Sequence, residues 1–173
     1  MGESKKNKLV IDKLLSNNTK EVLFTINKLR NIGNKDLIPH LIDLLATHKS
    51  DEIKQSVVNL LYDLKYQTAA DKIISAIESD KYLNIRTELL TVCWQSSLDF
   101  SKYIDVFTQI FISADFKEAF EAFTVIESVE EKLDAKLAEE SIIALKNIVS
   151  NIDESKKELL SELIHVLESK ELY

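Results

Sequence analysis

Apolar residues recur along this chain at spacings of three and four, which place them on one face of a helix. In KEVLFTINKLRNI this face is formed by Val22, Ile26 and Leu29, and in DEIKQSVVNLLYDL it includes Ile53 and Val57. The same spacing occurs in NIRTELLTVCW and KEAFEAFTVIESV, and further helical stretches lie between these segments. Because no stretch combines sustained two-residue alternation with β-branched residues, we predict an all-α protein.

Polar residues before several apolar stretches mark where helices are expected to begin. Asp36, Ser50, Asp51 and Ser101 have short oxygen-bearing side chains that can accept hydrogen bonds from the first backbone N–H groups of a helix. Pro39 is expected in the first turn of a helix. Backbone N–H groups in that turn have no acceptor within the helix, so the N–H group that proline lacks costs no helical hydrogen bond.

The helical pattern repeats along the chain. A shift of 32 residues carries Leu29 onto Leu61 and then onto Cys93, and a further shift of 33 reaches Ile126. The last unit needs a longer shift of about 37, which suits a terminal repeat. Two helices per period predict a solenoid of stacked helical hairpins. We expect one domain, 1–173, with five units at about 4–32, 36–66, 69–98, 101–131 and 134–170.

The junctions between paired helices resemble those of HEAT repeats, in which a turn with Asp precedes a second helix that opens with an apolar–basic pair. AIESDKYLNIRTELLTV has Asp80 followed by Ile85 and Arg86, and THKSDEIKQSVVNLL has the same order. LIPHLIDLL resembles the start of a first helix, whereas ISADFKEAFEAFTVI departs because no aliphatic residue precedes Lys117. The resemblance covers nearly the whole chain and implies a right-handed α-solenoid of five HEAT-like hairpins. It also implies that the second helices line a concave face.

Cys93 and Trp94 are the only cysteine and tryptophan, and they are adjacent. Cys93 occupies a repeat position that holds Leu29, Leu61 and Ile126 in other units, so we expect a core side chain rather than a nucleophile. A catalytic cysteine would need a nearby base and a partly open electropositive site.

The position of Trp94 accepts charged residues in other units, so we expect it at the surface. Three residues earlier in each unit lies a small polar residue. Across the units, these two positions form two rows of residues, which on the concave face would border a shallow polar groove. Tyr62 and Trp94 would form an aromatic step in this groove, and Tyr and Trp often anchor interfaces. The alternative is that both rings only cover gaps between helices. The candidate binding residues are Tyr62, Trp94, Asn59, Thr91, Asn27, Arg30, Thr124 and Glu127, and Phe120 is a candidate for the groove edge.

Charge is unevenly distributed along the sequence. The net charge is −7, which disfavours binding to nucleic-acid phosphates because that requires clustered Lys and Arg. Residues 1–35 contain eight basic and three acidic residues, whereas residues 117–173 contain seven basic and fourteen acidic residues. This asymmetry predicts weak head-to-tail self-association at low salt.

We expect no cofactor, no metal and no membrane association. His40 and Asp43 lie three residues apart on one helix, but two ligands do not make a zinc site. The N-terminal region has no apolar run of signal-peptide length, and no apolar stretch would span a bilayer. A single cysteine cannot form an internal disulfide, which fits a cytoplasmic protein.

Three functional hypotheses remain from the sequence. The first, which we favour, is a non-enzymatic scaffold that binds a protein or peptide on its concave face. The second is an enzyme on HEAT-like repeats, resembling DNA glycosylases or tetrapyrrole lyases of that architecture, although a glycosylase would need a basic groove. The third is a self-assembling structural protein.

Overall fold

The computed structural model describes residues 2–30 and 34–173, and within them the secondary structure is helical apart from one isolated parallel bridge between Leu133 and Leu172. The all-α prediction is therefore confirmed. The predicted end of the first repeat, residue 32, lies outside the described residues. The chain divides into two compact units, Met1–Leu98 and Asp99–Tyr173.

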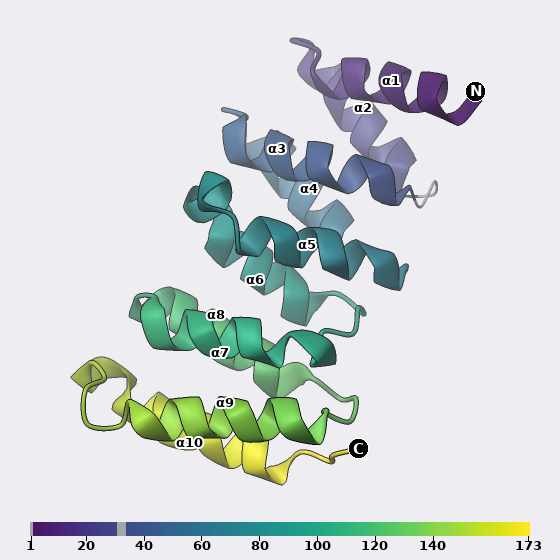
Figure 1. Cartoon of the computed structure of the whole chain (residues 1–173). Helices are drawn as coiled ribbons and strands as arrows, with labels where there is room; N and C mark the ends of the chain where they lie inside the picture. The colour runs from purple at the N-terminus through teal and green to yellow at the C-terminus, as the bar shows by residue number, and fades with distance from the viewer. Residues whose placement is uncertain (1, 31–33) are drawn as a thin grey trace. The chain divides into compact units, whose positions relative to one another are not determined.

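The first unit consists of paired helices. α1 packs against α2, α3 against α4, and α5 against α6, and in addition α2, α4 and α6 pack successively and α3 packs against α5. Figure 1 shows α3 and α5 in front of α4 and α6, so these helices form two layers. The bounds are α1 (Gly2–Leu14), α2 (Thr19–Leu29), α3 (Ile38–Thr47), α4 (Asp51–Tyr62), α5 (Ala70–Ile77) and α6 (Arg86–Gln95).

The second unit has the same type of packing. α7 packs against α8 and α9 against α10, while α7 also contacts α9 and α8 contacts α10. Large apolar side chains such as Phe107 and Phe111 are fully buried in its core. The bounds are α7 (Ile104–Ser113), α8 (Phe116–Ser128), α9 (Ala135–Asn147) and α10 (Lys157–Ser169).

Side-chain caps explain where several helices begin, and they correct part of the sequence prediction. Ser50 caps α4 as predicted, with its Oγ accepting a hydrogen bond from the Ile53 N–H at 3.4 Å. Asp36 and Asp51 instead lie just inside their helices. The carboxylate of Asp99 accepts the Ser101 N–H at 2.7 Å, so Ser101 is not the cap. Asn34 caps η1 two positions before Asp36, and Ser50 caps α4 one position before Asp51. The N-cap position of η4 is Phe100, which has no capping side chain.

Short 3-10 helices directly precede five of the α-helices, α3, α5, α6, α7 and α10. Pro39 lies in the first turn of α3, as predicted. The 3-10 segments are η1 (Lys35–Leu37), η2 (Gln67–Ala69), η3 (Asp80–Ile85), η4 (Ser101–Tyr103) and η5 (Glu154–Lys156).

Two lysines of the last hairpin stabilise the C-terminal ends of the preceding hairpin. The ammonium of Lys156 donates to the backbone carbonyls of Phe111, Ile112 and Ala114 at 3.0, 3.2 and 2.9 Å, at the end of α7. The ammonium of Lys170 donates to the carbonyls of Glu127 and Val129 at the end of α8. Each lysine satisfies helix-terminal carbonyls that have no partner within their own helix.

Candidate functional site

The repeat position of Cys93 is a core position, as the sequence predicts. Leu29, Leu61, Cys93 and Ile126 are all buried. The thiol of Cys93 donates to the carbonyl of Leu89 at 3.3 Å, and burial raises the pKa of this thiol well above its usual value. A buried thiol with a raised pKa has little thiolate at neutral pH, so Cys93 lacks the properties of a nucleophile.

The next repeat position reaches the surface at the C-terminal ends of the second helices. Tyr62 is the last residue of α4, and Trp94 lies one residue before the end of α6. Both side chains are partly exposed, and Arg30 and Glu127 in the equivalent positions are exposed. The expectation that neither ring is fully enclosed is confirmed. Since α2, α4 and α6 pack successively, Arg30, Tyr62 and Trp94 lie on consecutive neighbouring helices of the first unit.

The row of small polar residues formed by Asn27, Asn59, Thr91 and Thr124 is at the surface, but some of these side chains already form hydrogen bonds within their own helices. Asn27 and Asn59 are exposed, and the Asn59 side-chain oxygen accepts a hydrogen bond from Gln55 at 3.0 Å. The hydroxyls of Thr91 and Thr124 donate to backbone carbonyls four residues earlier, at 3.0 and 2.9 Å. A threonine on a helix readily bonds to the preceding turn, so the hydrogen atoms of these two hydroxyls are used within α6 and α8.

The candidate residues divide between the two units. Six belong to the first unit, and Thr124 and Glu127 belong to the second. Phe120, the candidate for the groove edge, lies in the second unit and is about half exposed. Its ring stacks between those of Phe116 and Phe123, with both centroid distances at 6.4 Å. The first-unit residues are Asn27, Arg30, Asn59, Tyr62, Thr91 and Trp94.

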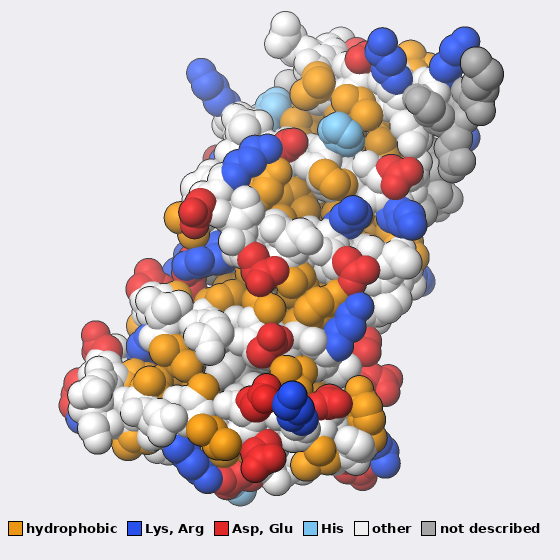
Figure 2. Space-filling view, viewed as in Figure 1, with side chains coloured by type: hydrophobic (Ala, Val, Ile, Leu, Met, Phe, Trp, Pro, Cys, Tyr) orange, Lys and Arg blue, Asp and Glu red, His pale blue; other side chains and the backbone are white. Residues whose placement is uncertain are grey.

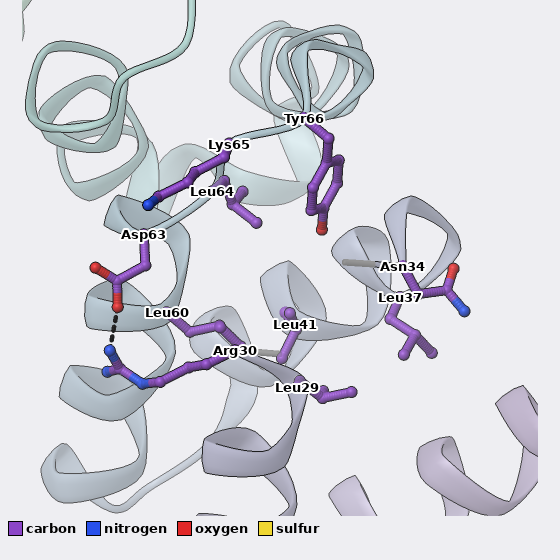
Figure 3. A pocket seen from close by; sticks show the side chains of 10 residues that line it. All are labelled: Leu29, Arg30, Asn34, Leu37, Leu41, Leu60, Asp63, Leu64, Lys65 and Tyr66. Atoms are coloured by element: carbon purple, nitrogen blue, oxygen red, sulfur yellow. Dashed lines mark hydrogen bonds and ion pairs between the residues drawn. The ribbon is translucent and has the colours of Figure 1, made fainter. Parts of the chain in front are cut away.

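A pocket of about 440 Å³ opens at the C-terminal ends of α2 and α4, close to the predicted rows. Buried leucines form much of its wall, and Figure 3 shows Arg30 and Asp63 joined by an ion pair beside Leu60. Burial raises the pKa of the Tyr66 phenol, which also lines the pocket. The pocket is lined by Leu29, Arg30, Asn34, Leu37, Leu41, Leu60, Asp63, Leu64, Lys65 and Tyr66.

Sequence reasoning found only Arg30 among these lining residues. The leucines that line the pocket belong to the apolar faces of their helices. Their spacing in the sequence is the same as that of fully packed core leucines, so it does not reveal that they line a pocket. The one available signal was Asp63, an acidic residue placed 33 residues after Arg30 and therefore about one repeat away. An opposite charge at that separation is expected to lie on the neighbouring hairpin.

Asp43 takes part in a hydrogen-bond cluster rather than a metal site. Its Oδ1 accepts hydrogen bonds from the Lys81 ammonium at 2.5 Å and from the Tyr82 hydroxyl at 2.8 Å, which connects α3 to η3. Burial by itself raises the pKa of this carboxyl, but the hydrogen bonds from Lys81 and Tyr82 outweigh it, so the pKa lies below its usual value. Across residues 2–30 and 34–173, no group of three or more His, Cys, Asp or Glu side chains is arranged to hold a metal ion.

Comparison with known proteins identifies no family. No family model matches this chain, and no curated protein matches it. Among solved structures, it is similar to an engineered protein whose crystal structure is known, with 12% sequence identity and a TM-score of 0.49 over 94% of this chain and 79% of that one. None of the helices in the described part of the chain has the length and apolar character needed to cross a lipid bilayer.

Proposed function

We propose that this chain is a right-handed α-solenoid of five HEAT-like hairpins that acts as a non-enzymatic scaffold in the cytoplasm. It binds a protein or peptide partner on a concave face formed by the second helices. The packing within each unit supports this architecture, because first helices contact first helices and second helices contact second helices. Stacked repeats that contact only their neighbours bury their cores in this way.

The observation that carries the proposed binding role is the pair of partly exposed aromatic side chains on α4 and α6. Tyr62 and Trp94 occupy the same repeat position on helices that pack together, and the residue before each, Leu61 and Cys93, is buried. A buried residue therefore fixes the helix face on which each ring lies. Tyr and Trp at such positions supply large contact areas with few rotatable bonds, which is why they dominate interface energetics.

The pocket beside Tyr62 gives this surface a second feature that suits a peptide. Asp63 directly follows Tyr62, and its ion pair with Arg30 lies at the pocket. A volume of about 440 Å³ admits a large apolar side chain, and the buried leucines provide an apolar wall for it. In the proposed complex, the partner places an apolar residue in this pocket while its neighbouring segment contacts Tyr62 and Trp94.

The test is affinity capture from the native host, comparing the wild type with the Tyr62→Ala/Trp94→Ala variant. Binding of a specific partner should weaken by at least about 30-fold, equivalent to about 2 kcal/mol, in a titration with the purified partner. Because the rings are at the surface, the free energy of unfolding should change by less than about 1 kcal/mol.

The matched control is Leu15→Ala/Leu83→Ala, which truncates two exposed apolar side chains outside the proposed surface. It should bind the partner like the wild type. Equal binding by the wild type and the Tyr62/Trp94 variant would refute the assignment of this surface. Salt-dependent binding to duplex DNA that requires Trp94 would instead favour the glycosylase-like alternative.

A further inference from the structure

The last hairpin carries an apolar groove of about 530 Å³ between α9, α10 and the C-terminal tail. Leu167 lies buried within it, Ile142 is partly exposed, and Ile143 and Leu172 are 51% and 49% exposed. Two half-exposed aliphatic side chains lining one concave surface are unusual for a solvent-facing helix pair, because each exposes apolar area to water. Figure 2 shows apolar side chains among acidic ones over this part of the molecule.

The groove is held in shape by interactions on both sides. The Lys146 ammonium pairs with the Glu168 carboxylate at 2.7 Å, which connects α9 to α10. The tail is fixed by three backbone hydrogen bonds: from the Leu133 N–H to the Glu171 carbonyl at 2.9 Å, from the Tyr173 N–H to the Leu133 carbonyl at 3.0 Å, and from the Ala135 N–H to the Tyr173 carbonyl at 3.3 Å. Because Leu172 lies between these bonds, the wall that it forms is already ordered before anything binds.

The surroundings of the groove are acidic. Residues 134–173 contain nine acidic and five basic residues, a net charge of −4. Two of the five basic residues, Lys156 and Lys170, direct their ammonium groups to backbone carbonyls of the preceding hairpin. Glu139 lines the groove itself. The groove therefore fits an apolar surface that carries positive charge.

The first hairpin of the same chain has these properties. Residues 1–30 contain seven basic and three acidic residues, a net charge of +4. Leu9 on α1 and Phe24 on α2 are 58% and 59% exposed. The ammonium of Lys28 lies 4.3 Å from the centroid of the Phe24 ring, so apolar and positive groups occur together. A binding surface needs this combination of an apolar centre with complementary charge around it.

We propose that the groove of the last hairpin binds the first hairpin of a second copy of this chain. The interface is heterologous, because two different surfaces meet. When two molecules pair, one therefore retains an unused first hairpin and the other retains an unused groove. Leu9 and Phe24 contribute apolar area to the groove, and the lysines of residues 1–30 face the acidic residues around it. Its apolar contacts come from Leu9, Phe24, Ile143 and Leu172 and do not involve Tyr62 or Trp94, on which the proposed partner-binding face is centred.

A complementation experiment tests the pairing of the two surfaces. One variant, Leu9→Gln/Phe24→Gln, disables the first hairpin, and the other, Ile143→Gln/Leu172→Gln, disables the groove. All four substitutions leave the net charge unchanged, and Gln is tolerated in helices. Analytical ultracentrifugation at about 0.01 M and about 1 M salt, where the screening length falls from roughly 30 to 3 Å, measures association over a range of concentrations.

At low salt, the mass of the wild type should rise with concentration above 19.8 kDa, and high salt should reduce this association. Each variant alone should remain monomeric because one of its two surfaces is disabled. An equimolar mixture of the variants should form a 1:1 complex, since the intact groove of one meets the intact first hairpin of the other. The Tyr62→Ala/Trp94→Ala variant should associate like the wild type, which separates this proposal from the proposed function.

The matched control is Leu83→Gln/Phe116→Gln, which changes two residues that are each 48% exposed and lie outside both surfaces. It should associate like the wild type. The proposal is overturned by a wild type that stays monomeric at low salt, by a surface variant that associates normally, or by a mixture that stays monomeric. Circular dichroism verifies folding, and the single substitutions Phe24→Gln and Ile143→Gln replace any double variant that unfolds.

Discussion

Cys93 and Trp94 are adjacent residues with opposite environments. Cys93 is buried, with its thiol directed to the Leu89 carbonyl, while Trp94 is partly exposed. An α-helix turns by about 100° per residue, so neighbours readily lie on different faces. The pair therefore has two separate roles: the cysteine contributes to packing, and the tryptophan belongs to the proposed binding surface.

The burial of Cys93 predicts slow modification by a thiol reagent under native conditions. Reaction requires the protein to open, so the labelling rate should increase steeply with denaturant and reach the rate of a free thiol once the chain unfolds. Cys93→Ala should lower the free energy of unfolding by about 1–2 kcal/mol through cavity formation. Rapid stoichiometric labelling of the folded protein would contradict the core assignment.

At the scale of secondary-structure elements, buried and partly buried polar contacts connect successive hairpins. Lys156 is only 5% exposed, yet its ammonium has three carbonyl partners at the end of α7. Nothing in the sequence distinguishes Lys156 from the neighbouring Lys157, and only the packing shows that Lys156 reaches the end of the preceding helix.

Replacing Lys156 should weaken this connection between helices. Lys156→Met keeps an apolar chain of similar length but removes three charge-assisted hydrogen bonds, so the free energy of unfolding should fall by about 1.5–3 kcal/mol. Lys157→Met is the matched control, because the neighbouring side chain is half exposed and pairs only with Glu154 at the surface. Its effect should stay within about 0.5 kcal/mol in urea denaturation. Equal effects of the two substitutions would show that the carbonyl contacts contribute nothing.

The Asp43 cluster predicts a pH-dependent connection between α3 and η3. The pKa of Asp43 is lower in the folded than in the unfolded chain, so its contribution to stability is complete above the unfolded pKa near 3.9 and is lost as pH falls through the folded pKa. Asp43→Asn should therefore be less stable than the wild type at pH 7. Because the Asp43 side chain is partly exposed to solvent, the difference in the free energy of unfolding between the two proteins should be less than about 1 kcal/mol.

The pH dependence of that difference is measured by urea denaturation of both proteins between pH 7 and pH 2. The two stabilities should converge as the wild-type carboxyl becomes protonated. Glu162→Gln, on the exposed side of α10, measures the general effect of removing one acidic charge. A difference between Asp43→Asn and the wild type that persists unchanged at pH 2 would rule out the proposed charge interaction.

At the scale of the whole molecule, the chain divides into two compact units. The contacts of Lys156 all lie in Asp99–Tyr173, so Lys156→Met should destabilise that unit in particular. We expect native-state hydrogen exchange of backbone amides in residues 99–173 to accelerate, while amides in residues 2–30 and 34–98 keep their wild-type rates. Equal acceleration throughout the chain would instead indicate that the units unfold together.

The spacing of apolar residues along the chain is enough to predict the helices and the inward-facing positions. Leu29, Leu61, Cys93 and Ile126 are buried as their register predicts, and Tyr62 is partly exposed as the next position predicts. These features are local, because the rotation per residue along a helix fixes which side chains share a face. The pattern of apolar residues therefore contains enough information for them.

The positions of hollow surfaces and of the ends of long polar side chains depend on how the hairpins pack against one another. The pocket requires residues from α2, α4 and the segments that follow them, and the groove requires Leu172 beside Ile143. Lys156 reaches the carbonyl of Phe111, 45 residues earlier in the chain. Such contacts depend on the packing of one hairpin against another and on flexible side chains that choose among many partners. Periodicity along the sequence does not encode those choices, because it specifies a face and not what lies opposite it.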